Sequence, residues 1–147
     1  MLKVARSYLR QAKARLEDAK EALPETNCPY AVRLSQECVE LSLKSVLKAV
    51  GIEYPKIHDV SDVLTEVRER FPEWFRAEVD FLRASSKILV KKRELSLYGG
   101  EEAFLSPDEV IDRNDAEDAI VRAEKTFKLC NDLLTELEKT AVDSGKD

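Results

Sequence analysis

The chain has 147 residues, a length that suits one domain with one hydrophobic core. Hydrophobic residues make up 44% of the sequence and charged residues 36%, whereas four glycines and five prolines supply too few turns for an all-β fold. The net charge of -5 excludes nonspecific coating of nucleic acid, although a local basic patch can still bind a phosphate.

The few cysteines and the single histidine restrict the chemistry of the chain. Cys28, Cys38 and Cys130 include no CxxC pair, and their odd number fits a reducing compartment. Cys38 and Cys130 lie on apolar stripes and are expected in the core. Glycine-rich phosphate loops and the HExxH and GxSxG motifs are absent, so we expect no metal and no cofactor. No segment approaches the ~20 apolar residues of a membrane span, so we expect a cytoplasmic protein with no membrane partner.

Two long helices are predicted in the first third of the chain. Residues 2–23 place apolar side chains in a strict four-three alternation, and Pro24 ends the helix. Residues 29–50 form the second helix, with Gly51 as its C-terminal cap. Its wide apolar arc predicts burial on most sides, or burial on one side and a subunit interface on another. The narrow polar strip that remains consists of Arg33, Glu37, Glu40, Lys44 and Lys48.

The middle of the chain is predicted to hold a short helix over residues 60–70 and a long helix over residues 73–97. The break at Phe71-Pro72 separates them. One apolar stripe of the long helix repeats every seven residues, and a second stripe lies well round the helix from it. Two apolar faces indicate two packing partners, either both within a bundle or one of them in a dimer interface. The seven-residue stripe is Trp74, Phe81, Ile88 and Leu95.

The last third of the chain is predicted to contain a loop and a long helix. The loop, residues 101–111, includes the capping-box pattern Ser106-Pro107-Asp108-Glu109, which favours one helical turn. The helix covers residues 113–139, and residues 140–147 are expected to form a disordered acidic tail. The sequence therefore predicts one all-α domain over residues 1–139, an antiparallel up-and-down bundle of four to five helices.

Arg93 is the most unusual residue of the long helix, because it lies in an apolar stripe where an aliphatic side chain is expected. Such an arginine must be paired, reach water or serve a ligand. One interpretation is an internal ion pair with Glu37 or Glu40. A pair of this kind tends to cost as much desolvation as it returns in attraction, so specificity or function is the other reason to keep it. The stripe is Phe75, Val79, Leu82, Ser86, Leu89, Arg93 and Ser96.

Two further features each admit two interpretations. Residues 83–93 contain five basic residues and no acid, which indicates a solvated face or, alternatively, a phosphate-contacting stripe. His58 precedes Asp59, a residue type that caps helices. We interpret His58 as a structural histidine that bonds backbone at this corner, with a proton carrier at a cleft edge as the alternative.

Three segments together resemble a prokaryotic HEPN domain (higher eukaryotes and prokaryotes nucleotide-binding). They are RLSQECVELSLK at residues 33–44, the residues Gly51-Ile52, Pro55 and His58-Asp59-Val60, and RELSLYG at residues 93–99. The resemblance covers roughly residues 1–138. It implies a four-to-five-helix bundle that forms a homodimer, in many prokaryotes as the toxin of a pair with a minimal nucleotidyltransferase antitoxin.

The resemblance also implies a chemistry, from which this chain departs at one position. Many HEPN domains are metal-independent ribonucleases, in which an arginine stabilises charge on the scissile phosphate. A histidine, separated from the arginine by four to six residues, moves protons for attack by the ribose 2′-hydroxyl. Arg93 matches the arginine, but Tyr98 stands at the expected histidine position, and a phenol is a poor general base at neutral pH. Tyr98 is therefore catalytic, a modification target, or only a helix-end residue; the tyrosine nucleotidylated in related toxins corresponds to Gly100.

The leading hypothesis is a HEPN-domain homodimer that works with a nucleotidyltransferase partner and binds nucleotide or RNA at the dimer cleft. Arg93 would contact the phosphate, and Tyr98 is the second catalytic candidate. Glu37, Glu40 and Lys44 are the further binding-site candidates. Ribonuclease activity would be weak and independent of metal. The alternative is a non-enzymatic binding or assembly module in which Arg93 forms a structural ion pair.

Overall fold

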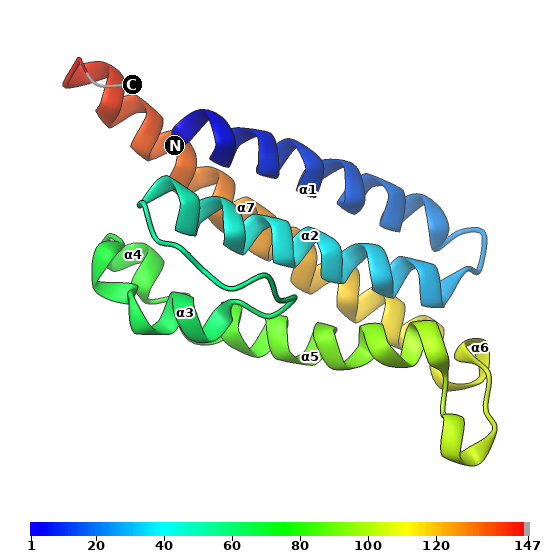
Figure 1. Ribbon diagram of the computed structural model, residues 1–147. Helices are drawn as coiled ribbons and strands as arrows, with labels where there is room; N and C mark the ends of the chain where they lie inside the picture. Colours follow the sequence, from blue (N-terminus) through cyan, green and yellow to red (C-terminus); the bar gives the residue numbers. More distant parts are fainter. Residues whose placement is uncertain (146–147) are drawn as a thin grey trace.

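Four long helices form the body of the molecule, and successive long helices run in opposite directions (Figure 1). The computed structural model describes residues 1–145, without the side chain of Glu102. Within residues 1–145 no strand occurs, so the predicted all-α up-and-down bundle is confirmed. The N-terminus lies beside the C-terminal part of the last helix (Figure 1). The long helices are α1 (Leu2–Ala22), α2 (Cys28–Ala49), α5 (Val79–Tyr98) and α7 (Arg113–Asp143).

Helix α2 lies at the centre of the bundle and packs against α1, α5 and α7. Fourteen of its 22 residues are buried, which confirms the burial on most sides predicted from its wide apolar arc. The helices around it present small side chains to the core, and small side chains let helix axes approach closely. The fully buried alanines of these neighbours are Ala5, Ala12 and Ala19 of α1 and Ala116, Ala119 and Ala123 of α7.

The prediction of one continuous helix over residues 73–97 is wrong, because the chain forms a separate turn, α4 (Glu73–Arg76), before α5 begins. The Glu78 amide donates to the Phe75 carbonyl over 2.9 Å, an i→i+3 bond that interrupts the α-helical ladder. The Phe75 ring is buried, with its centroid 4.9 Å from that of the Phe71 ring. This aromatic contact ties α4 to the segment that precedes it.

The connections from α2 to α5 and from α5 to α7 include short helical turns. The predicted helix over residues 60–70 is divided into α3 (Ser61–Glu66) and the 3-10 turn η1 (Arg68–Arg70). After α5, the chain forms the 3-10 turn η2 (Glu101–Ala103) and the single turn α6 (Pro107–Val110). Ser106 and Glu109 make both hydrogen bonds of the predicted capping box at α6.

The last helix is longer than predicted. Helix α7 continues to Asp143, so the first residues of the predicted tail at 140–147 are helical. No glycine or proline precedes Gly145 in this stretch, and the Thr140 hydroxyl donates to the Glu136 carbonyl over 3.0 Å. The last two residues of the predicted tail, 146 and 147, lie outside the described residues.

Candidate functional site

Two adjoining cavities lie where α5 faces α2 and the segment that follows α2. The larger has a volume of about 300 Å³ and the smaller about 230 Å³. His58 and Arg93 line both cavities, so the only histidine of the chain and the unusual arginine border the same space. The larger cavity is also lined by Val90, Glu94, Leu97 and Tyr98, and the smaller by Arg15, Glu37, Glu40 and Leu41.

Arg93 is held by two side chains of α2. Its Nη1 donates to Gln36 Oε1 over 2.8 Å and to Glu37 Oε2 over 3.1 Å, and 19% of the Arg93 side chain remains exposed. The predicted ion pair with Glu37 is therefore present. Within residues 1–145, no side chain is bonded to Nε or Nη2 of Arg93. These donors leave part of the guanidinium available for a ligand in the cavities.

Glu37 lies between two arginines. Besides Arg93, it accepts a hydrogen bond from Arg15 Nε over 3.2 Å. One carboxylate thus serves two guanidinium groups, which both line the smaller cavity. Guanidinium groups that share a single carboxylate keep donors that can contact an anion such as a phosphate. Arg15 belongs to α1, and sequence reasoning did not identify it.

Glu40 does not pair with Arg93. It accepts hydrogen bonds from Lys44 Nζ over 2.8 Å and from Gln36 Nε2 over 3.1 Å, and it lies 2.7 Å from His58 Nδ1. Burial would raise the pKa of Glu40, but the hydrogen bonds from Lys44, Gln36 and His58 outweigh it and hold the pKa below its usual range. Glu40 is therefore a carboxylate at neutral pH.

His58 contacts a carboxylate rather than the backbone. The predicted hydrogen bond from His58 to the backbone is therefore wrong, because the segment after α2 brings the ring against Glu40. The adjacent Asp59 anchors this segment: its Oδ1 accepts from the Ser61 amide over 2.9 Å and from the Ser86 hydroxyl over 2.7 Å. His58 thus projects from a fixed point beside the cavities.

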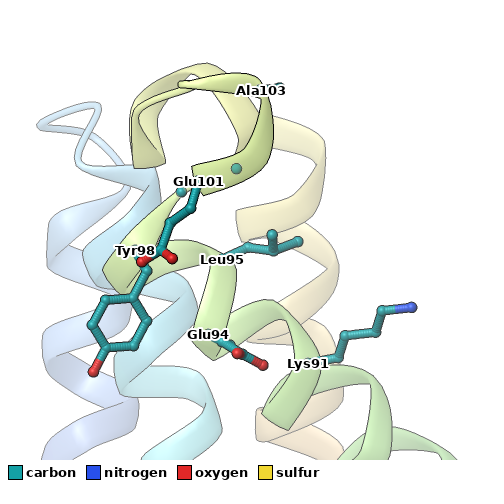
Figure 2. A pocket seen from close by; sticks show the side chains of 8 residues that line it. Lys91, Glu94, Leu95, Tyr98, Glu101 and Ala103 are labelled. Carbon is teal, nitrogen blue, oxygen red and sulfur yellow. The ribbon is translucent and has the colours of Figure 1, made fainter.

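Tyr98 and Lys44 differ in their relation to the two site cavities. Tyr98 is 61% exposed at the end of α5, where it lines the larger site cavity and also a third cavity of about 480 Å³. Figure 2 shows the side chains of Tyr98 and Lys91, which both line the third cavity, pointing away from each other. Lys44 bonds Glu40 and lies over the Tyr54 ring, 5.6 Å from its centroid, and it lines neither site cavity.

The basic stretch at residues 83–93 does not act as one unit. Arg83 and Lys87 pair with carboxylates of the neighbouring segment, Asp62 and Asp59, over 3.0 to 3.2 Å. Only Arg93 among the basic residues of this stretch lines the site cavities. In the described part of the chain, no group of three or more His, Cys, Asp or Glu side chains is placed to hold a metal ion. Nor does any helix within residues 1–145 have both the length and the apolar character needed to cross a membrane.

The fold and the sequence identify the class of protein. The HEPN domain family matches the chain over residues 5–133, so the chain belongs to the HEPN domain family. It is 29% identical over 141 residues to MJ1304 of Methanocaldococcus jannaschii, which is named as a candidate toxin, across 92% of this chain and 91% of that protein. The crystal structure of TT1696 from Thermus thermophilus has the same fold, with a TM-score of 0.71 at 24% sequence identity. That similarity covers 87% of this chain and 96% of TT1696.

Proposed function

We propose that this HEPN domain binds RNA or a nucleotide through Arg93, which contacts a phosphate. The observation that carries the proposal is the arrangement of the guanidinium group. Nη1 is fixed by Gln36 and Glu37, whereas Nε and Nη2 have no partner among the described residues and Arg93 lines both cavities. A guanidinium that is fixed on one side and unpaired on the other is suited to bidentate contact with a phosphate.

The proposal includes the assembly in which the site works. The protein forms a homodimer in which Arg93 faces the dimer cleft, and it acts with a nucleotidyltransferase partner as a toxin-like component. Membership of the HEPN family and the name of the Methanocaldococcus jannaschii relative support this part of the proposal. Light scattering of the purified protein measures the oligomeric state, and a monomer at all accessible concentrations would contradict the dimer.

Substitution of Arg93 tests phosphate binding directly. We expect Arg93→Ala to weaken binding of a short single-stranded RNA and of ATP by about 10-fold to 100-fold, because a charge-assisted contact to phosphate is lost. Fluorescence anisotropy measures the affinity. Arg83→Ala is the matched control, since Arg83 belongs to the same helix but pairs with the exposed Asp62. Equal affinities of Arg93→Ala and the unsubstituted protein would overturn the proposal.

The Arg93–Glu37 ion pair favours a second candidate, a non-enzymatic binding or assembly module in which Arg93 is structural. The two candidates differ in their prediction for stability. A structural role requires that Arg93→Ala lower the free energy of unfolding, because the buried Gln36 loses a hydrogen bond and Glu37 keeps only Arg15 as an ion-pair partner. It also requires that RNA binding be absent in the unsubstituted protein. If Arg93 binds phosphate instead, Arg93→Ala should lose RNA binding while its free energy of unfolding stays close to that of the unsubstituted protein. Urea unfolding and anisotropy on the same variant separate these outcomes.

A further inference from the structure

A further cavity lies at the end of the bundle opposite α6, where the start of α1 is beside the end of α7 (Figure 1). Its volume is about 430 Å³. Among the described residues, none that lines this cavity also lines the two site cavities. We call it the terminal trough; it is lined by Leu2, Lys3, Arg6 and Arg10 of α1 and by Glu138 and Val142 of α7.

Arg6 fixes the two walls of the terminal trough to each other. Its Nε and Nη2 donate to the Glu138 carboxylate, which also lines the trough. Its Nη1 donates to Asn131 of α7 over 2.6 Å, and Nη2 also donates to Thr135 over 3.3 Å. Every nitrogen of this guanidinium group is thus bonded to α7, and the charge of Glu138 is balanced. The trough is therefore formed before any ligand binds.

Lys3 and Arg10 supply positive charge that no group of the trough balances. Both side chains are exposed, and neither has a hydrogen-bond or ion-pair partner within residues 1–145. They are seven residues apart, which places them on one face of α1, about 10 Å from each other along the helix axis. Although the net charge of the chain is -5, residues 2–16 contain five basic residues and no acidic one. The trough therefore attracts anionic groups.

The terminal trough also offers apolar surface on both walls. Val142 of α7 is 76% exposed, and Leu2 of α1 is partly exposed. Exposed aliphatic side chains in a concave site favour a ligand that fills the site with an apolar group. Together with the two unpaired cations, they indicate a ligand with an apolar body and anionic groups beside it.

We propose that the terminal trough binds an acidic amphipathic helix of a partner protein. On such a helix, carboxylates at positions i and i+7 repeat the spacing of Lys3 and Arg10, because both pairs span two helical turns. An aliphatic side chain at i+3 or i+4 lies between the carboxylates on the same face. This side chain enters the trough and contacts Leu2 and Val142, while the carboxylates pair with the two cations.

An anionic membrane surface fits the terminal trough less well. Anionic headgroups are bound by clusters of about four to eight Lys or Arg residues. Within residues 1–145, the trough supplies two cations without a partner. Its concave shape suits side chains that project from a helix rather than a flat surface. These features favour a protein partner.

The test uses the full-length protein and a fluorescein-labelled, alanine-rich peptide of about 16 residues, long enough to form a helix. The peptide carries Glu at positions i and i+7 and Leu at i+3 and i+4. We expect fluorescence anisotropy at low salt to give a dissociation constant on the order of 10–100 µM. The double variant Lys3→Glu, Arg10→Glu should weaken binding by about 10-fold or more, because two attractions become repulsions.

Lys13→Glu is the matched control for the double variant. Lys13 is an exposed basic residue of the same helix, it has no partner within residues 1–145, and it does not line the trough. Its substitution should change the affinity by less than about threefold, whereas a peptide with Ser in place of both Leu residues should bind about 10-fold more weakly. Arg93→Ala should bind the original peptide normally, since Arg93 lines other cavities. Circular dichroism checks that each variant is folded.

Two results would overturn the partner helix. One is the absence of peptide binding at concentrations up to about 1 mM. The other is an equal loss of affinity per reversed charge in Lys13→Glu and in the double variant, which would show that general electrostatic attraction explains the binding. Cosedimentation with phosphatidylserine vesicles tests the membrane: vesicle binding that the double variant abolishes, without peptide binding, would assign the trough to lipid instead.

Discussion

At the scale of single residues, Gln36 explains how the site is held together. It is 1% exposed, and its amide is bonded at both ends, to Arg93 and to Glu40. A buried amide without these partners would cost on the order of 1–3 kcal/mol. The two ion-pair systems of the site are therefore coupled through a residue that cannot easily turn away from either of them.

Asp59 anchors the segment that carries His58, and its ionisation should be visible in the stability of the protein. Burial would raise the pKa of Asp59, but hydrogen bonds from Ser61, Ser86 and Lys87 outweigh it and lower the pKa from 3.8 to about 2. The stabilisation is therefore present above about pH 4 and is lost as the pH falls towards 2. We expect Asp59→Asn to lower the free energy of unfolding by about 1–2 kcal/mol at pH 7.

Urea unfolding at pH 7 and at pH 2.5 measures this effect. The difference between Asp59→Asn and the unsubstituted protein should shrink at the lower pH. At pH 2.5 the Asp59 carboxyl is largely protonated in the unfolded chain, whereas its lowered pKa of about 2 leaves it only partly protonated in the folded protein. Asp62→Asn is the matched control: Asp62 also bonds Lys87 but is exposed, so this variant should have little effect. A difference that is the same at both pH values would contradict the role of the Asp59 charge.

Some parts of the candidate site could be predicted from the sequence. Arg93 was identifiable because a charge interrupts an apolar stripe, and the polar strip of α2 offered Glu37 as its partner. The contact between Glu40 and His58 was not predictable, because it joins a helix to an irregular segment 18 residues away. Apolar periodicity predicts helices and strands, but it does not predict where the side chain of a residue in an irregular segment lies. The spacing of Gln36 and Glu40, four residues apart on a helix, is the signal that could have identified Gln36.

At the scale of elements, Gly99 ends α5 and allows the chain to turn sharply. Its backbone has φ 67° and ψ −159°, a region that is essentially restricted to glycine. A Cβ atom at this position would lie 2.2 Å from the Leu105 carbonyl oxygen and 2.8 Å from the Ser106 carbonyl carbon. The turn therefore depends on glycine for its backbone conformation and for the close approach of the returning chain.

We expect Gly99→Ala to lower the free energy of unfolding by about 2–4 kcal/mol, since backbone strain and a steric clash add. Gly51→Ala is the matched control. Gly51 also has a positive φ, 75°, but nothing lies within 4 Å of a Cβ atom there, so strain alone should cost about 1 kcal/mol. Urea unfolding of both variants measures the comparison. Equal losses of unfolding free energy in the two variants would show that the close approach of Leu105 and Ser106 does not add to the cost of Gly99→Ala.

The sequence predicted the long helices better than their interruptions. Apolar stripes at helical spacing identified α1, α2 and α7, because burial of one face dominates their stability. The break between α4 and α5 was missed because Phe75 and Val79 are both buried and four residues apart, as in a continuous helix. Only the local i→i+3 bond at Glu78 distinguishes the two arrangements. The extension of α7 over residues 140–143 was missed because these residues do not continue the apolar stripe of the helix.

At the scale of the whole molecule, α2 connects the site to the core. One side of this helix carries Gln36, Glu37 and Glu40, and another side packs against α7. Cys38 lies on the core side, where its Sγ is 3.9 Å from the Ala123 carbonyl of α7. Residues that form the site and residues that pack in the core thus belong to the same helix, α2. The geometry of the site therefore depends on the packing of the bundle.

This arrangement predicts that the buried cysteines react only when the bundle opens. Burial raises the pKa of the Cys38 thiol to about 12 and also raises that of Cys130, which is fully buried, so neither forms a thiolate in the folded state near pH 8. In a variant with Cys28→Ser, we expect native protein to resist alkylation by iodoacetamide. In urea, alkylation of Cys38 and Cys130 should follow the same transition as the loss of helical circular dichroism, because separation of α2 from α7 requires unfolding of the whole bundle. Labelling of either thiol at urea concentrations where the helix signal is intact would show instead that α2 and α7 separate locally.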